Sequence, residues 1–553
     1  MKKLTALLLV LVMVMGALAA CAPSNQPSTN NPPVDSETPL VIQWDQADNT
    51  DKFEAPHKST GLSYHTVMMW NQLFKFDRKY AESDERTYAW ELATGYTRSE
   101  DNKSITYTLR EGAKWSDGEP VTVEDVVFSV MAAIKDPVST QAGVYKDLVG
   151  YQEFVNGETD ELAGVTTEGN TITFTMTITS AVQHYNPYVL PAHCFEGIEW
   201  KDISTARYWY APVTSGPYKF VKANFPDYAM LTRNELYFGE PAGIKNVTCV
   251  SYEAATTDAA IASMIQGTSD ITTRTVTSSV QLASQIVDMN RDCKILTMRT
   301  GAYRALMFND GTRTDGNNNE LLVNNPNVRL AISLLVDEDT IANYTEATAV
   351  KVLGDPRNPL TTHEFDNANK SLDLEKAKQL LDAAGWNYND KIEIFCYYAD
   401  QISRDVLEII KADAAKIGVK IEIDVVTENS STAMNTERNW DLLFYQAPGT
   451  EKCPSSAASQ LCTTRTYRPS TGANYAKYKE LWTAWSSIAD SYSPEGIAAS
   501  QALAAFNYQN TDIIPIYSAD NIVVYNAARV QIPETAFDNN DEVLDLHLWK
   551  MLK

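Results

Sequence analysis

The sequence predicts an α/β fold, because strand-like and helix-like patterns alternate along the chain. Ile105, Tyr107 and Leu109 alternate with threonines, which is the period of a half-buried strand. Apolar side chains then recur at helical spacing from Val123 to Met131. With 553 residues the chain is long enough for roughly three domains.

Turn and cap residues divide this stretch into a strand, an ordered turn and a helix. Asp101 favours a turn before the strand, and residues 115–118 (W-S-D-G) favour a second turn after it. Pro120 cannot continue a central strand. Thr122, with Asp125 three positions later, is typical of a helix N-terminus. We interpret Trp115 and Asp117 as packing and turn residues rather than ligand contacts.

The same stretch resembles the signature of the solute-binding proteins of ABC importers, in the oligopeptide- and nickel-binding family (family 5). The matching residues are Leu109, Arg110, Gly112, Lys114, Trp115, Ser116, Asp117, Gly118, Pro120, Val121, Thr122, Asp125, Val126, Phe128 and Ser129. Because many ordered matches cross two turns, the resemblance is specific.

Further segments resemble the family in its own order along nearly the whole mature chain. They are residues 68–74, 189–193, 213–220, 259–271, 306–309, 327–337, 374–385, 439–443 and 513–517. Residues 165–178 contain two alternating runs around Gly169-Asn170, which predict a hairpin. Gly267 is expected to end a helix before a strand, and residues 406–423 predict another helix followed by a strand.

The resemblance implies a two-lobed fold like that of periplasmic binding proteins, with an extra subdomain inserted into lobe I. Lobe I would comprise residues 38–62, 205–290 and 513–553, the inserted subdomain residues 63–204, and lobe II residues 291–512. The chain would cross between lobes near residues 297–308 and 511–517. Ligand would bind between the lobes and be enclosed when they close.

The front of the chain has the pattern of a bacterial lipoprotein. Residues 1–20 read as a signal peptide, with Lys2 and Lys3 before an apolar run too short to be a membrane span. Leu18 to Cys21 resembles a lipobox, which implies a diacylglyceryl thioether on Cys21 and palmitate among its acyl chains. The alternative is an ordinary secretory signal with a chance cysteine. Residues 21–37 are rich in Asn, Pro, Ser and Thr and predict a disordered tether.

Charge and motifs argue against several other functions. A net charge of −25 disfavours nucleic acid, which needs clustered Lys and Arg. The sequence has no nucleophile elbow, phosphate-binding loop or zinc-protease motif, so we expect no enzyme, no cofactor and no metal site. His193 is a lone histidine and is interpreted as structural. Cys453 and Cys462 close a short loop, and whether they pair stays open.

The resemblance implies a receptor that captures peptides. Candidate ligand-binding residues are Trp70, Asn71, Tyr303, Asn309, Gln446 and Glu451. Peptide binders of the family hold the ligand's ammonium group with an aspartate after the segment that matches residues 439–443. Here Thr450 and Cys453 occupy the corresponding positions, and Glu451 is the acid left to substitute. An oligosaccharide or a metal complex is therefore an alternative ligand, and a secreted hydrolase a remote alternative function.

The same resemblance implies the protein's partners and location. We expect a monomer held to the cell membrane by its lipid, on the extracellular face, or on the periplasmic side in a Gram-negative cell. The permease and ATPase subunits would be separate chains, so this protein's task would be non-covalent capture of the solute.

Overall fold

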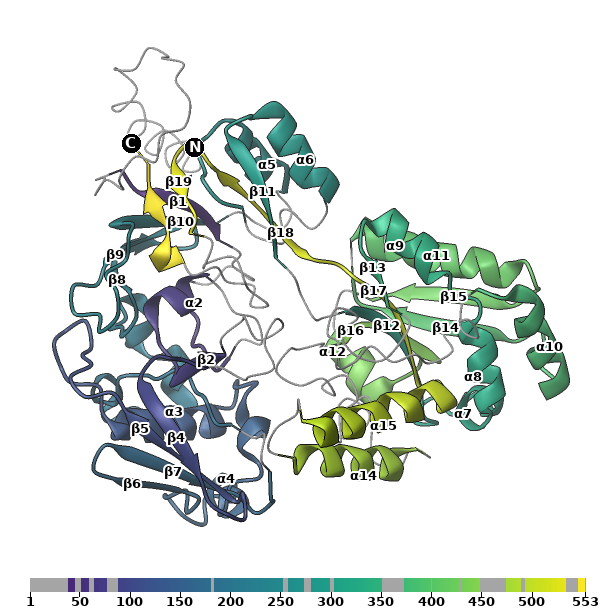
Figure 1. Ribbon diagram of the computed structural model, residues 1–553, viewed down its shortest axis with the longest axis horizontal. Coiled ribbons are helices and arrows are strands. Elements are labelled where there is room, and N and C mark those ends of the chain that lie inside the picture. Colours follow the sequence, from purple (N-terminus) through teal and green to yellow (C-terminus); the bar gives the residue numbers. More distant parts are fainter. Residues whose placement is uncertain are drawn as a thin grey trace.

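A computed structural model defines the architecture of most of the mature chain (Figure 1). It describes residues 38–44, 51–58, 64–76, 88–180, 184–251, 257–272, 280–298, 303–350, 372–398, 400–426, 430–447, 474–488, 493–533 and 546–552. The predicted signal peptide, the tether, Cys21, Thr450, Glu451, Cys453 and Cys462 lie outside these ranges.

The first lobe is built on a sheet that joins segments far apart in the sequence. Its strand order is β1 (Leu40–Trp44), β10 (Asn246–Ser251), β9 (Tyr228–Arg233) and β8 (Tyr218–Asn224). β11 (Cys293–Met298) pairs with β18 (Asn521–Asn526), and Ile271 bridges β1 to β18. Helices α5 (Thr257–Ile265) and α6 (Val280–Met289) bury Met264, Ala283 and Ile286 against β11 and β18. Gly267, at φ +70°, follows α5 as the sequence predicts, but the strand expected after it is reduced to the isolated bridges of Ile271.

The inserted subdomain carries the strand, turn and helix predicted first. Its sheet has the order β4 (Ala93–Arg98), β5 (Ser104–Leu109), β7 (Thr171–Thr175) and β6 (Val165–Glu168). The three apolar residues of β5 are buried and their neighbours half-buried, which confirms the alternation. The β6–β7 hairpin turns at Gly169-Asn170, since Glu168 pairs with Thr171. Helix α3 (Val123–Lys135) begins after Thr122, whose N–H donates to the Asp125 carboxylate at 2.9 Å.

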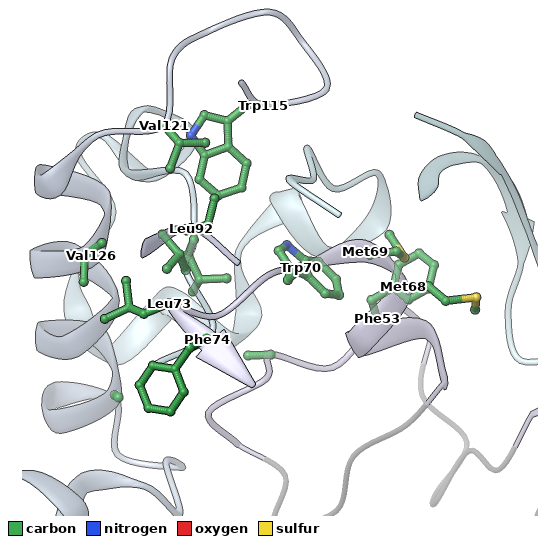
Figure 2. Packing of buried hydrophobic residues seen from close by; sticks show 14 of the residues in the cluster. Phe53, Met68, Met69, Trp70, Leu73, Phe74, Leu92, Trp115, Val121 and Val126 are labelled. Carbon is green, nitrogen blue, oxygen red and sulfur yellow. The ribbon is translucent and has the colours of Figure 1, made fainter. Parts of the chain in front are cut away.

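Short elements complete this subdomain and its junction with lobe I. They are α2 (Tyr64–Met69), the paired strands β2 (Phe74–Phe76) and β3 (Tyr88–Trp90), α4 (Tyr151–Asn156), and the 3-10 helices η2 (Ala142–Tyr145), η3 (Ala192–Phe195), η4 (Trp200–Thr205) and η5 (Arg207–Tyr210). Figure 2 shows Trp70 between two groups of this core, with Trp115 on one side and Phe53 on the other. Since one continuous apolar cluster spans both parts, the subdomain packs as an extension of lobe I.

The second lobe is a six-stranded mixed sheet with helices on both faces. The strand order is β13 (Thr348–Ala349), β17 (Ile513–Ser518), β12 (Tyr303–Phe308), β16 (Leu442–Ala447), β14 (Lys391–Cys396) and β15 (Lys420–Val425). β14, β15 and β16 are parallel, whereas β12 is antiparallel to both of its neighbours. Because side chains alternate along β12, Leu306 and Phe308 enter one core and Ala305 and Met307 the other.

Helices surround the second sheet. They are α7 (Glu320–Asn324), α8 (Pro326–Ser333), α9 (Glu338–Thr345), α10 (Leu374–Ala384), α11 (Gln401–Ala415), α12 (Ser430–Thr432), the π-helix η8 (Ala433–Glu437), α14 (Tyr475–Ser486) and α15 (Pro494–Asn510). The helix and strand predicted over residues 406–423 correspond to α11, which begins five residues earlier, and to β15. After β17 the chain returns to lobe I, where β18 is followed by β19 (Val530–Gln531), η10 (Leu546–Leu548) and β20 (Lys550–Met551). Within the described ranges, no helix combines the length and apolarity needed to span a bilayer.

Two expected lobe boundaries differ from the strand pairing. The boundary at 290/291 assigns β11 to lobe II, but β11 pairs with β18 and packs on α6 in lobe I. The boundary at 512/513 assigns β17 to lobe I, but β17 pairs with β12 in the lobe II sheet. Each of these strands belongs to the lobe whose core buries it. The crossings between the lobes therefore lie between residues 298 and 303 and between 518 and 521 (Figure 1).

Candidate functional site

The carboxyl edge of the lobe II sheet has the geometry of a ligand site. The parallel strands β14 and β16 end there at Cys396 and Ala447, and both crossings to lobe I leave the sheet at the same edge. In open α/β sheets, ligands bind outside the carboxyl ends of the strands. The candidate site therefore lies on the side of lobe II where the chain passes to lobe I.

Arg304 is a charged residue at this edge. Its guanidinium carbon lies 3.6 Å from the centroid of the Tyr398 ring, so the cation stacks on an aromatic face. Its Nη1 is buried and has no hydrogen-bond partner among the described residues, whereas the side chain as a whole is half-buried. Burial opposes the charge, but Tyr398, Tyr517 and Asp400 raise the pKa of Arg304 above its ordinary value. The group is therefore a cation whose hydrogen-bonding capacity is not filled.

Tyrosines and one amide surround Arg304. The Tyr398 hydroxyl lies 2.8 Å from that of Tyr397 and accepts a bond from the Gln446 backbone N–H at 3.0 Å. Gln446 pairs directly with Arg304 across the two strands, so both side chains lie on one face of the sheet. Burial raises the pKa of Tyr517 to about 12, so its hydroxyl is neutral at physiological pH.

Among the described residues, Asp400 is the acid that raises the pKa of Arg304, and its carboxylate already accepts other hydrogen bonds. Asp400 accepts bonds from the N–H and hydroxyl of Ser403, at 2.8 and 2.9 Å, and so caps α11. A carboxylate used in this way leaves Arg304 without a close anionic partner among the described residues. The arrangement favours a bound anion over a neutral solute.

Of the predicted ligand residues, Tyr303 and Gln446 lie together at this edge. Tyr303 is buried and pairs with Ala447, and Gln446 is exposed. Asn309 lies at the opposite end of β12, where its amide donates to the carbonyls of Arg438 and Trp440 at 3.1 and 2.9 Å. These bonds tie Asn309 to the segment before β16, and ligand contact by Asn309, Tyr303 and Gln446 stays a prediction.

Trp70 and Asn71 lie in lobe I and are both 1% exposed. The Trp70 indole donates to the Tyr208 hydroxyl at 2.9 Å, and the Asn71 amide donates to Glu91 at 3.1 Å. These bonds hold the segment in the core of lobe I. Their contact with a ligand also stays a prediction, and Glu451 lies outside the described residues.

A second group of chemically active side chains lies on the inserted subdomain. Donor atoms of Asp117, His193 and Cys194 all lie within 4.8 Å of one another. The sequence shows His193 as a lone histidine because Asp117 is 76 positions away. The adjacent His-Cys pair is the signal that sequence reasoning passed over.

The half-buried Ser204 and the buried Asp136 and His57 do not form a hydrolytic triad. His57 Nε2 lies 2.9 Å from the Asp136 carboxylate, and the Ser204 hydroxyl donates to the same carboxylate. A nucleophilic serine must bond to its base, with the acid behind the base. Here the acid occupies the centre, so the contacts support a structural tie.

With this geometry in view, sequence comparison decides the family. The profile of the bacterial extracellular solute-binding proteins, family 5, matches residues 87–467. The chain belongs to this family. Its members are binding proteins rather than enzymes, and the match agrees with the resemblance read from the sequence.

Family 5 relatives cover most of this solute-binding protein. The nickel-binding periplasmic protein of Escherichia coli is 24% identical over 428 residues, 73% of this chain and 75% of the relative. The oligopeptide-binding protein OppA of Lactococcus lactis subsp. lactis is 22% identical over 422 residues, 70% of this chain and 67% of the relative.

Solved structures share the two-lobed fold of this solute-binding protein. A putative peptide-binding protein, AppA, from Clostridium difficile has a TM-score of 0.75 at 18% identity, with 93% of this chain and all of the other covered. Lactococcal OppA, closed around an endogenous peptide, has a TM-score of 0.70 at 18% identity, with 92% and 98% covered. NikA from Brucella suis, in complex with Fe(III)-EDTA, has a TM-score of 0.71 at 18% identity, with 93% and 100% covered.

Proposed function

We propose that this protein is the lipid-anchored extracellular receptor of an ABC importer and captures peptides between its lobes. The main observation behind this proposal is the Arg304 guanidinium at the carboxyl edge of the lobe II sheet. Its buried Nη1 has no hydrogen-bond partner among the described residues. A peptide's C-terminal carboxylate would supply the missing acceptor, and charge-assisted bonds of this kind are among the stronger hydrogen bonds. Permease and ATPase subunits would be separate partners.

Charge favours a peptide over an oligosaccharide. A neutral sugar would leave the buried guanidinium without an anion, and an incompletely paired buried charge is costly. The peptide enclosed by lactococcal OppA, which shares this fold, supports the same choice. A metal complex carrying carboxylates is the second candidate, since such a ligand would also satisfy Arg304, and NikA holds Fe(III)-EDTA on this fold.

Calorimetry with matched peptides tests the role of Arg304. Candidate peptides come from a thermal-shift screen and are compared with a free and with an amidated C-terminus. Loss of a hydrogen bond to a charged group costs about 1.5–3 kcal/mol, which corresponds to roughly 10- to 100-fold in affinity. We expect amidation to weaken binding by that factor, and Arg304→Gln to weaken binding of the free acid while leaving the amide unchanged.

Arg291→Gln is the matched control, because it removes one positive charge from an exposed position between α6 and β11. It should leave both affinities unchanged. Equal affinity of the wild type for acid and amide would contradict the carboxylate anchor. If the protein binds metal chelates that carry carboxylates but binds no peptides, its ligand is the second candidate, a metal complex.

Membrane fractionation tests the anchor. Cys21→Ser removes the thiol that would carry the lipid, so the variant should be released into the medium or periplasm, whereas Cys293→Ser should remain with membranes. If the Cys21 variant fractionates with membranes as the wild type does, the lipobox interpretation is wrong.

A further inference from the structure

Asp117, His193 and Cys194 form a compact group of metal-ligand side chains outside the interlobe site. His193 Nε2 lies 2.8 Å from the Asp117 carboxylate, and both side chains are 34% exposed. Cys194 is a free, half-buried cysteine beside them. Imidazole, thiolate and carboxylate are the three donor types that zinc uses in proteins.

One buried carboxylate holds both segments that carry these donors. Asp125 accepts the Trp115 indole N–H at 3.0 Å, which fixes the turn of residues 115–118. Its other oxygen accepts the Ala192 N–H at 2.8 Å, at the first residue of η3. Because Asp125 is 4% exposed, these bonds are shielded from water. The donors are therefore placed by the core rather than by flexible side chains alone.

The turn is also fixed from its other side. The Ser116 N–H donates to the Thr214 carbonyl at 2.8 Å, and the Thr214 N–H donates to the Ser116 hydroxyl at 3.0 Å. On η3, the Cys194 N–H donates to the Pro191 carbonyl at 3.0 Å. Sites whose supporting contacts are made in advance lose less entropy when a ligand binds.

We propose that Asp117, His193 and Cys194 form a binding site for one late first-row divalent cation of the Zn²⁺, Co²⁺ or Ni²⁺ class. Tetrahedral coordination with ordinary zinc bond lengths places donors about 3.3–3.6 Å apart. The three donor atoms, within 4.8 Å of one another, reach that spacing by small side-chain rotations. The thiolate selects against Mg²⁺ and Ca²⁺, which prefer oxygen donors.

Binding exchanges protons for the metal. A cysteine thiol is largely protonated at neutral pH, whereas the metal ligand is the thiolate. The ion would displace this proton and replace the direct His193–Asp117 contact with two metal bonds. The exposure of both side chains leaves a fourth position open to water or to a donor atom of another molecule.

Cobalt titration tests this site independently of any transported solute. The full mature chain is used with serine at Cys21, Cys453 and Cys462, so that thiols outside the described residues do not contribute. We expect one equivalent of Co²⁺ to produce a thiolate-to-cobalt charge-transfer band and tetrahedral d–d bands. Zn²⁺ should remove both sets of bands, and Mg²⁺ should not.

Matched variants assign the donors. Cys194→Ala should abolish the charge-transfer band, whereas Cys293→Ala, at another free cysteine, should retain it. His193→Gln and Asp117→Asn should each weaken binding at least tenfold. Saturating Zn²⁺ should raise the melting temperature of the parent but not of Cys194→Ala, since a ligand that binds only the folded state stabilises it.

Two results would overturn the proposal. One is the lack of a charge-transfer band in the parent at micromolar cobalt, which would leave Asp117 and His193 as a surface hydrogen-bonded pair. The other is a band that survives Cys194→Ala, which would place the metal elsewhere. Neither result bears on solute capture at the lobe II edge.

Discussion

At the scale of single residues, buried charges are satisfied by dense local networks. Arg313, with a side chain 5% exposed, contacts Asp315, Glu393 and Asp441 at 2.8, 2.6 and 3.2 Å. Asp441 also accepts the Glu393 N–H at 2.9 Å. Burial raises the pKa of Asp441, so this carboxylate depends on the guanidinium to remain ionised.

Replacing Arg313 by Met should destabilise the protein strongly. The variant leaves Asp441 buried without its cation, and breaking a buried pair in this way costs about 3–5 kcal/mol. Urea unfolding measures the loss, and Arg313→Met combined with Asp441→Asn should recover part of it. A loss below about 1 kcal/mol would put this pair in the class of weak surface ion pairs.

The buried Asp136 makes stability depend on pH. Burial by itself would raise the pKa of Asp136, but hydrogen bonds from His57, Ser204 and the Val138 N–H lower it below its ordinary value. A group with a lowered folded-state pKa stabilises the protein above its unfolded pKa of about 3.9, and this contribution is lost as the pH falls through the folded value.

Asp136→Asn should therefore cost stability at pH 7, and its difference from the wild type should shrink below about pH 4. Urea unfolding at several pH values gives both curves, with the exposed Asp160→Asn as control. A difference that is constant down to pH 2 would mean that the charge of Asp136 does not contribute.

At the scale of elements, the positions where strands end determine which side chains lie at the candidate ligand site. β16 ends at Ala447 at the carboxyl edge, and Thr450 and Glu451 follow it in the sequence. The resemblance to the family's peptide binders implies that the segment after β16 would supply an acid for the ligand's ammonium. An ammonium enclosed without a carboxylate loses several kcal/mol of hydration that nothing replaces.

We therefore expect poor discrimination between peptides with free and with acetylated N-termini. Calorimetry on a matched pair measures the ratio of affinities, and Glu451→Gln is the informative variant. A strong preference for the free amine that Glu451→Gln abolishes would mean that Glu451 acts as the anchor. A strong preference that survives the substitution would place the anchor on another residue.

At the scale of the whole molecule, two lobes are joined by two short crossings that leave the same edge of the lobe II sheet (Figure 1). Short connections of this kind permit hinge closure around a ligand, because a few residues absorb the change in backbone angles. The cores on either side share no buried cluster among the described residues.

Small-angle scattering should show a smaller radius of gyration at saturating ligand than without ligand. Closure excludes solvent from between the lobes, so the particle becomes more compact. The comparison uses the mature chain with Cys21→Ser, to avoid the lipid, and ligands from the thermal-shift screen. Superimposable profiles with and without a bound ligand would argue against closure.

The sequence by itself determined the local elements and the family. Alternation predicted β5, Thr122 and Asp125 predicted the start of α3, and Gly169-Asn170 predicted the β6–β7 turn, because each depends on contacts between near neighbours. The ordered matches around Trp115 likewise identified the family without any structure.

Only the tertiary structure determined which lobe each strand belongs to and which polar side chains contact one another. β11 joins lobe I because its partner, β18, lies more than 200 residues later, and no local pattern encodes that pairing. In the sequence, Arg304 is a single charged residue within an apolar run. Only the fold places the ring of Tyr398, just after β14, against its guanidinium. His193 and Cys194 lie close enough to Asp117 to share one metal ion only because Asp125 holds their 3-10 helix beside the turn that contains Asp117. These contacts depend on long-range packing, which sets partners that sequence periodicity does not specify.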